Sequence, residues 1–207
     1  MKTKNPAHGG FQLYTVALEA LTSAIPDSLT FEQAAVLPLA ISTAASGLFQ
    51  KDHLALPLPS SNRKSTDKTL LVWGGASSVG ATAVQLAAAS GLRVVATASS
   101  HNHEFVKSLG ASSVIDYKSA SVVNDVVTVL KESEVVGVYD AISESSSFEP
   151  IAVIIKKLNS HFKVVTVLPS GNPEYSSGMS SCSVLYSESL YHKCLTLISH
   201  LGVFSLI

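Results

Sequence analysis

Residues 71–80 read Leu-Val-Trp-Gly-Gly-Ala-Ser-Ser-Val-Gly, and this stretch decides the fold. A short apolar run, typical of a buried strand, ends at the paired glycines, and apolar residues at helical spacing follow from Ser78 to Ser90. Glycine suits this junction because the chain must turn sharply and because a pyrophosphate has to approach the backbone closely. Backbone N–H groups at a helix start, aided by the helix dipole, bind phosphate charge. The stretch therefore predicts a nucleotide-binding turn.

The glycine spacing alone is a weak signal. Four residues separate Gly75 from Gly80, so the pattern G-x-G-x-x-G is not matched, and no Lys-Ser or Lys-Thr follows as in a Walker sequence. A tight strand-to-helix turn without a ligand stays open as the alternative. The residues downstream favour the binding turn.

Strand and helix patterns alternate from residue 69 to residue 168. The predicted strands are 69–73, 92–97, 113–116, 135–141 and 162–168, and the predicted helices are 78–90, 103–109, 122–131 and 148–158. Such alternation implies right-handed βαβ crossovers and a parallel sheet that is covered on both faces. We therefore expect an α/β fold with a doubly wound, Rossmann-like parallel sheet.

The flanking segments follow other patterns. Residues 11–16 alternate as an isolated strand would, and Thr30 and Gln33 have capping-box spacing at the start of an Ala-rich helix. Pro38 is expected to end or kink that helix, which resumes from Ile41 to Phe49. Two segments rich in Pro, Gly and Ser are predicted to be loops: 54–68 and 170–189.

Composition narrows the class of protein. The 207 residues are 46% hydrophobic and 14% charged, with a formal net charge of -1, so a sizeable core can form. No long basic run indicates a nucleic-acid or anionic-membrane partner. The N-terminus has no apolar region typical of a secretory signal, and no apolar run is long enough to span a membrane. A cytoplasmic protein is the expectation.

Cys182 and Cys194 are the two cysteines, and they have no CxxC spacing. Two thiols do not make a structural zinc site unless several other side chains join them. A disulfide between them is possible, but reduced thiols and no bound metal are the expectation.

The end of the second predicted strand bears on the choice of dinucleotide. A site for NAD usually places Asp or Glu about 20 residues after the glycines, to bind the ribose 2′-hydroxyl. Residues 98–102 read Ala-Ser-Ser-His-Asn there and include no carboxylate. Hydroxyl, amide and imidazole groups can instead bind a 2′-phosphate, which favours NADP(H). A Ser/Asn helix cap is the alternative, and both can hold together.

Four motifs occur in the order found in the medium-chain dehydrogenase/reductase superfamily, which this chain resembles. They are Gly74 to Gly80, Ala96 to Asn102, Lys107 to Ala111 and Val114 to Tyr117. Within that superfamily the chain is similar to the zinc-independent quinone-oxidoreductase-like and fungal trans-enoyl reductase branch. Residues 35–45 resemble the segment that links the two domains in this branch.

The resemblance implies roles for particular residues. It implies cofactor contacts at the Gly-rich turn, at the 2′-phosphate segment, at an adenosine-side tyrosine and beside the nicotinamide, and it implies a substrate cleft near the linking helix. The implied cofactor residues are Gly75, Ala76, Ser77, Ser78, Val79, Gly80, Ser99, Ser100, His101, Asn102, Tyr117, Leu168 and Pro169, and the implied cleft residues are Leu39 and Thr43. Purely structural roles remain open for Tyr117, Pro169 and Thr43.

The resemblance also implies a domain arrangement. Residues 1–29 match the last part of an N-terminal β-barrel (GroES-like) catalytic domain, 30–68 are linking helices and a loop, 69–170 are the NADP-binding domain, and 171–207 are a divergent tail. Family members carry a longer barrel domain, so the chain is expected to be incomplete relative to them.

For function, the resemblance implies hydride transfer from NADPH to an activated alkene or a quinone. The implied substrate is a small enone, enoyl thioester or quinone, and a homodimer or a polyketide-synthase partner is left open. No residue of this sequence identifies itself as the proton donor. A non-catalytic NADP(H)-binding module is the competing hypothesis, and a zinc-dependent alcohol dehydrogenase is a weaker one.

Overall fold

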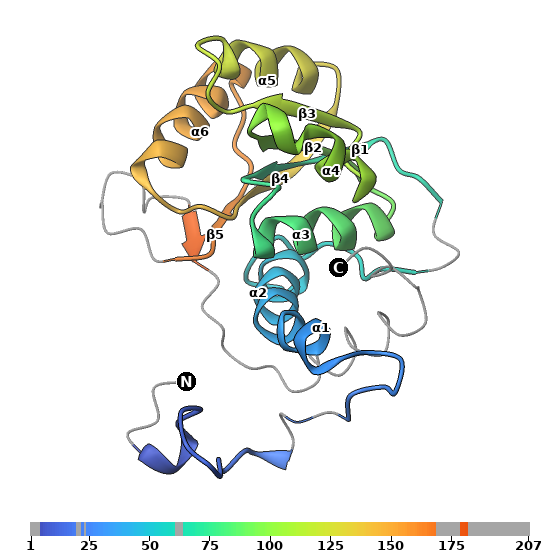
Figure 1. Ribbon diagram of the computed structural model, residues 1–207. Helices are drawn as coiled ribbons and strands as arrows, with labels where there is room; N and C mark the ends of the chain where they lie inside the picture. Colours follow the sequence, from blue (N-terminus) through green and yellow to red (C-terminus); the bar gives the residue numbers. More distant parts are fainter. Residues whose placement is uncertain (1–4, 20–21, 23, 61–63, 169–178, 182–207) are drawn as a thin grey trace.

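The computed structural model describes residues 5–19, 22, 24–60, 64–168 and 179–181. A parallel β-sheet with helices on both faces forms its centre (Figure 1). The strands are β1 (Lys68–Trp73), β2 (Arg93–Ala98), β3 (Ser113–Asp116), β4 (Glu134–Asp140), β5 (Val164–Thr166) and β6 (Met179–Ser181). The helices are η1 (Pro6–His8), α1 (Phe31–Ala35), α2 (Leu37–Phe49), α3 (Ser78–Ala89), η3 (Ser100–Asn102), α4 (His103–Ser108), α5 (Val122–Leu130) and α6 (Ser145–Leu158).

The strand order is β3-β2-β1-β4-β5-β6, and all neighbours are parallel. The chain winds outward from β1 to β3, crosses back through α5 to β4, and then winds the other way. This is the doubly wound arrangement that the alternating pattern predicts, so the expected fold class is confirmed. The order reverses between β1 and β4, and in such sheets ligands bind at the carboxyl ends of the strands on either side of that point.

Alternate side chains of β1 pack into two different apolar cores, one on each face of the sheet. Leu70 and Val72 pack in a cluster with α2, α3 and α4, whereas Leu71 and Trp73 pack in a second cluster with α5 and α6. Because strand side chains point alternately to opposite faces, a β1 that is apolar at every position has to be covered on both sides. The helices α3 and α6, which follow β1 and β4, therefore lie on opposite faces of the sheet.

Three predictions about the flanking segments are wrong. Residues 11–14 form bends and residues 15–16 are irregular, so no strand forms there. The break in the linking helix falls at Val36, and Pro38 lies in the first turn of α2, where its missing N–H costs no hydrogen bond. The segment 170–189, expected to be a loop, contains β6, which pairs with β5. The capping box of Thr30 and Gln33 is confirmed at the start of α1.

Candidate functional site

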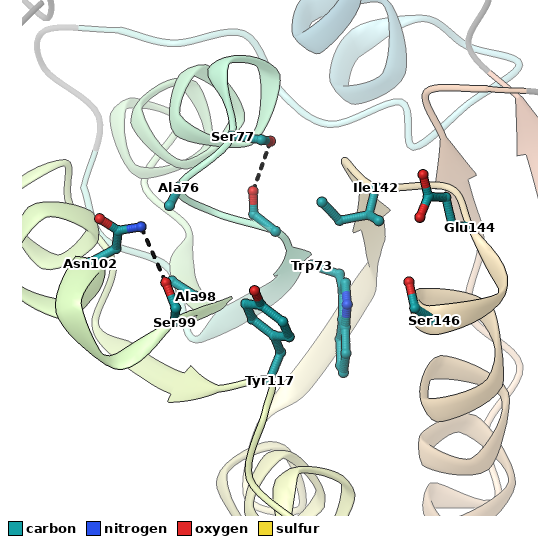
Figure 2. A pocket seen from close by; sticks show the side chains of 11 residues that line it. Trp73, Ala76, Ser77, Ala98, Ser99, Asn102, Tyr117, Ile142, Glu144 and Ser146 are labelled. Carbon is teal, nitrogen blue, oxygen red and sulfur yellow. Dashed lines mark hydrogen bonds between the residues drawn. The ribbon is translucent and has the colours of Figure 1, made fainter.

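A cleft of about 360 Å³ crosses the carboxyl ends of the central strands at the point where the strand order reverses (Figure 2). It runs from the end of β2, past the turn after β1, to the start of α6. The lining residues are Trp73, Gly74, Ala76, Ser77, Ala98, Ser99, Asn102, Tyr117, Ile142, Glu144 and Ser146. Five of these lining residues are among those for which the family resemblance implies a cofactor contact: Ala76, Ser77, Ser99, Asn102 and Tyr117.

The turn between β1 and α3 is fixed by hydrogen bonds to the end of β2. The Gly74 N–H donates to the Thr97 hydroxyl at 3.0 Å, and the Gly75 N–H donates to the Thr97 carbonyl at 2.8 Å. Ser77 then caps α3, because its hydroxyl accepts from the Gly80 N–H at 3.1 Å. The chain thus reverses within a few residues and points the start of α3 at the cleft.

Three backbone donors remain available at this turn. Within the described residues, the N–H groups of Ala76, Ser78 and Val79 have no protein acceptor. The first N–H groups of an α-helix have no partner inside the helix and meet the positive end of its dipole. Since Ala76 and Ser77 line the cleft, this edge suits an anion such as a pyrophosphate.

The glycines of the turn are required by packing against protein. A Cβ on Gly80 would lie 2.1 Å from the Gly74 carbonyl oxygen, so any side chain there would force α3 away from the turn. A Cβ on Gly75 would meet Ala96 at 3.0 Å, on the core side. The positive φ of the turn, 82°, belongs to Gly74. Gly75 and Gly80 therefore have a packing reason of their own, and the close approach of a pyrophosphate to this turn stays a prediction.

The end of β2 forms the second part of the cleft. Ser99 is almost buried, and its hydroxyl accepts a hydrogen bond from the Asn102 side-chain amide at 3.3 Å. The His101 Nε2 lies 3.4 Å from the same hydroxyl. His101 and Ser100 do not line the cleft, and Ser100 is exposed. The side chains of His101 and Asn102 thus gather around the Ser99 hydroxyl, and residues 99–102 include no carboxylate.

Tyr117 follows β3 and forms the floor between these two parts. The residue is 45% exposed, and the Lys118 ammonium lies 5.8 Å from the ring centroid. The Asp116 carboxylate accepts from the Lys118 N–H at 2.9 Å. Tyr117 thus lines the cleft with a partly exposed ring, and the Lys118 ammonium lies over one face of it.

The opposite wall is the turn between β4 and α6, which the sequence analysis missed. The Asp140 carboxylate, fully buried, accepts from the Ile142 N–H at 3.0 Å, the Ser143 N–H at 3.1 Å and the Ser147 hydroxyl at 2.6 Å. Burial raises the pKa of Asp140 above its ordinary value, against these hydrogen bonds, and the nearby Glu144 carboxylate acts in the same direction. The network fixes the positions of Ile142 and Glu144 at the cleft.

Ser143 ties this wall to the end of β5. Its hydroxyl accepts from the Val167 N–H at 2.8 Å and from the Leu168 N–H at 3.2 Å. Ser143 adopts a φ of 60°, which is uncommon for a residue with a side chain. Leu168 is thereby held next to the β4–α6 turn, although it does not line the cleft, and Pro169 lies outside the described residues.

The structure does not bring Leu39 and Thr43 to this cleft. Thr43 is buried in α2, where its hydroxyl donates to the Leu39 carbonyl at 2.7 Å and its own carbonyl accepts from the Tyr139 hydroxyl at 3.2 Å. The Leu39 side chain is exposed. A role for these two residues in substrate binding stays a prediction.

One general signal could have found the missed wall. The segment after the fourth strand, residues 141–147, reads Ala-Ile-Ser-Glu-Ser-Ser-Ser and resembles an ordinary polar loop. In a doubly wound sheet, however, the strand that starts the second half lies next to the first strand, so its carboxyl end must border the ligand crevice.

Within the described ranges, no group of three or more His, Cys, Asp and Glu could hold a metal ion, and no helix is long and apolar enough to cross a membrane. Cys182 and Cys194 lie outside those ranges.

Comparison with known proteins agrees with this geometry. Residues 78–177 match the family model of the zinc-binding dehydrogenases, and the chain is 53% identical over 134 residues to trans-enoyl reductase himH of Aspergillus japonicus. The chain belongs to the medium-chain dehydrogenase/reductase superfamily. The himH match covers 65% of this chain and 39% of that protein.

Solved structures of superfamily members have the same fold. An alcohol dehydrogenase superfamily protein from Novosphingobium aromaticivorans is 26% identical, with a TM-score of 0.64 over 86% of this chain and 54% of that one. A quinone oxidoreductase from Thermus thermophilus, solved alone and with NADPH, has a TM-score of 0.59 and 22% identity over 84% of this chain and 54% of that one. The chain thus spans about half the length of these proteins, or less.

Proposed function

We propose that this chain binds NADP(H), with the pyrophosphate at the start of α3 and the 2′-phosphate at Ser99 to Asn102. The observation that carries the proposal is the cleft at the strand-order reversal, where free backbone N–H groups adjoin a polar segment without a carboxylate. The neighbouring N–H groups of Ser78 and Val79 would bind the pyrophosphate. The NADPH complex of the Thermus thermophilus quinone oxidoreductase supports this choice of cofactor.

The residues of the cleft fit the charge pattern of this cofactor. A 2′-phosphate near a carboxylate would be repelled, and the only carboxylate among the described cleft residues, Glu144, lies across the cleft from Ser99 and Asn102 (Figure 2). Asn102 can donate to phosphate oxygens through its amide, and Ser99 through its hydroxyl. NADPH is therefore expected to bind more tightly than NADH.

The proposed reaction is the reduction of an activated alkene or a quinone. The bound cofactor supplies a hydride, and the protein contributes by binding, orienting and excluding water around it. The name of the relative himH, a trans-enoyl reductase, supports an enoyl acceptor, and the quinone oxidoreductase supports a quinone. The substrate class is therefore a small enone, enoyl thioester or quinone, and the reaction needs no zinc.

A second candidate is a module that binds NADP(H) without catalysis. It is favoured by the lining of the cleft, which includes neither Leu39 nor Thr43, the two residues implied at the substrate.

The experiment separates the two candidates. The purified chain is titrated with NADPH, and NADPH oxidation is then followed by absorbance with a panel of quinones, enones and enoyl thioesters. Oxidation that depends on an acceptor supports the reductase, whereas binding without turnover supports the module. Absence of NADPH binding contradicts both. Elemental analysis of the same sample is expected to show far less than one zinc per chain.

A further inference from the structure

The charge of the cleft is unusual for a site that would hold a phosphorylated dinucleotide. Among its eleven described lining residues, Glu144 is the only one with a formal charge, and that charge is negative. A carboxylate cannot face a phosphate without repulsion. If the proposed function holds, any contact between Glu144 and the cofactor is made at a neutral hydrogen-bond donor rather than at a phosphate.

We propose that Glu144 is a specificity-determining residue that accepts a hydrogen bond from the exocyclic amine of the adenine ring. This inference rests on the proposed NADP(H) function and extends it to the recognition of the base.

The cleft is large enough for the adenosine half of the cofactor but not for the whole dinucleotide. A volume of about 360 Å³ is at the small end of the range that encloses a drug-sized molecule, so the whole dinucleotide does not fit. The 2′-phosphate sits on the ribose carbon next to the one that bears adenine. Because Ser99 and Asn102 line this same cleft, a 2′-phosphate bound there leaves the base inside the cleft, and the nicotinamide beyond it.

The middle of the cleft suits a planar base. Figure 2 shows Tyr117 and Trp73 between the Ser99–Asn102 side and the side formed by Ile142 and Glu144. Tyr117 lines the cleft with a partly exposed ring, on which a purine can stack. A base that extends from Ser99 over Tyr117 points its far edge, which carries the amine, toward the α6 wall.

Glu144 is held in place for this contact. Its backbone N–H donates to the Ser147 hydroxyl at 3.2 Å, and its carbonyl accepts from the Ser147 N–H at 2.9 Å. Asp140 fixes the preceding residues of the turn. A carboxylate offers about four lone-pair positions, which can accept from a ligand in the cleft. The unpaired N–H groups of the β1–α3 turn remain for the pyrophosphate.

The test compares NADPH with reduced nicotinamide hypoxanthine dinucleotide phosphate, in which a carbonyl oxygen replaces the adenine amine. Both ligands carry the same charge, so the contribution of long-range electrostatics to binding cancels in the ratio of their dissociation constants. The ratio is measured by calorimetry on the full 207-residue chain. We expect the wild type to bind NADPH about tenfold more tightly, because hydrogen bonds to charged groups have about this effect.

Glu144→Gln keeps the size of the side chain, and its amide can donate to the carbonyl of hypoxanthine. The ratio should fall to about threefold or less. Glu149→Gln, an exposed carboxylate of α6 that does not line the cleft, is the matched control and should keep the wild-type ratio.

Each outcome decides between the two proposals. Equal binding of both ligands by the wild type, or an unchanged ratio in Glu144→Gln, overturns the role of Glu144 and leaves the proposed function intact. A wild-type chain that binds neither ligand overturns the proposed function, and the role of Glu144 with it.

Discussion

The turn after β1 and the turn after β4 border the same cleft, but different chemistry holds them in place. The first is made by backbone and glycine: Gly80 lets α3 begin against the Gly74 carbonyl, and the turn leaves unpaired N–H groups at or next to the cleft. The second is made by side chains: Asp140 accepts three hydrogen bonds, and Ser143 ties the turn to the end of β5.

This difference assigns the two turns different tasks. Backbone donors at a helix start carry partial positive charge and suit an anion, whatever the neighbouring side chains are. A carboxylate network without a partner cation cannot face an anion, but it can fix an acceptor at a defined position. This difference supports the proposal that one side of the cleft binds phosphates and the other binds neutral polar groups.

The largest expected effect comes from Gly80→Ala. A Cβ there would lie 2.1 Å from the Gly74 carbonyl oxygen, so α3 and the turn have to separate. Alanine is the better helix former by about 1 kcal/mol, and we still expect a loss of about 2 kcal/mol or more in the free energy of unfolding. Urea unfolding measures this loss, and NADPH affinity should fall with it.

Gly10→Ala is the matched control for that variant. A Cβ on Gly10 would have no atom within 4 Å, so the free energy of unfolding should change by about 0.5 kcal/mol at most. Equal stability of the two variants would show that the contact between α3 and the turn does not hold the turn in place.

The next effect concerns the phosphate side of the cleft. Asn102→Asp places a carboxylate beside Ser99 with no change in size, so the 2′-phosphate should be repelled. We expect NADPH to bind about tenfold more weakly and NADH to change little. Asn124→Asp, on the exposed face of α5 beside Lys157, is the control. If Asn102→Asp weakened both cofactors equally, the 2′-phosphate would not lie at this segment.

The smallest expected effect is a pH dependence of the free energy of unfolding, which tests the β4–α6 turn. Burial raises the pKa of Asp140, so the folded chain keeps this proton at pH values above the ordinary 3.8, where the unfolded chain releases it. The free energy of unfolding should therefore fall as the pH rises from 3.8 through the raised pKa, and then level off. Asp140→Asn lacks this dependence.

Urea unfolding of wild type and Asp140→Asn between about pH 4 and pH 8 isolates the contribution of Asp140, because the other titrating groups cancel. The stability of the wild type relative to the variant should decrease with rising pH. A difference that increases with pH would mean that the three hydrogen bonds to Asp140 outweigh its burial.

The sequence predicts the β1–α3 turn, which is fixed by backbone and glycine, better than it predicts the β4–α6 turn. Apolar runs and glycines mark β1, β2 and the turn between them, because these features follow from local conformation and from burial on two faces. The expected strands and helices occur within a few residues of their positions, and five of the implied cofactor residues line the cleft.

The β4–α6 turn was not predicted, because the side chains that fix it depend on contacts between distant parts of the chain. Asp140 and Ser143 act through partners that only the folded chain supplies, such as the Val167 N–H on another strand. In the sequence they look like part of a polar loop. The same holds for α6, which begins three residues before the expected Phe148, because its start is fixed by the capping box of Glu144 and Ser147.

The central claim is that the cleft selects NADP(H) through backbone donors and a carboxylate-free segment at the end of β2. The most direct measurement is a titration of the wild-type chain with NADPH and with NADH, followed by the fluorescence of Trp73, the single tryptophan, which lines the cleft. We expect NADPH to bind at least about tenfold more tightly than NADH. Equal affinities, or a preference for NADH, would contradict it.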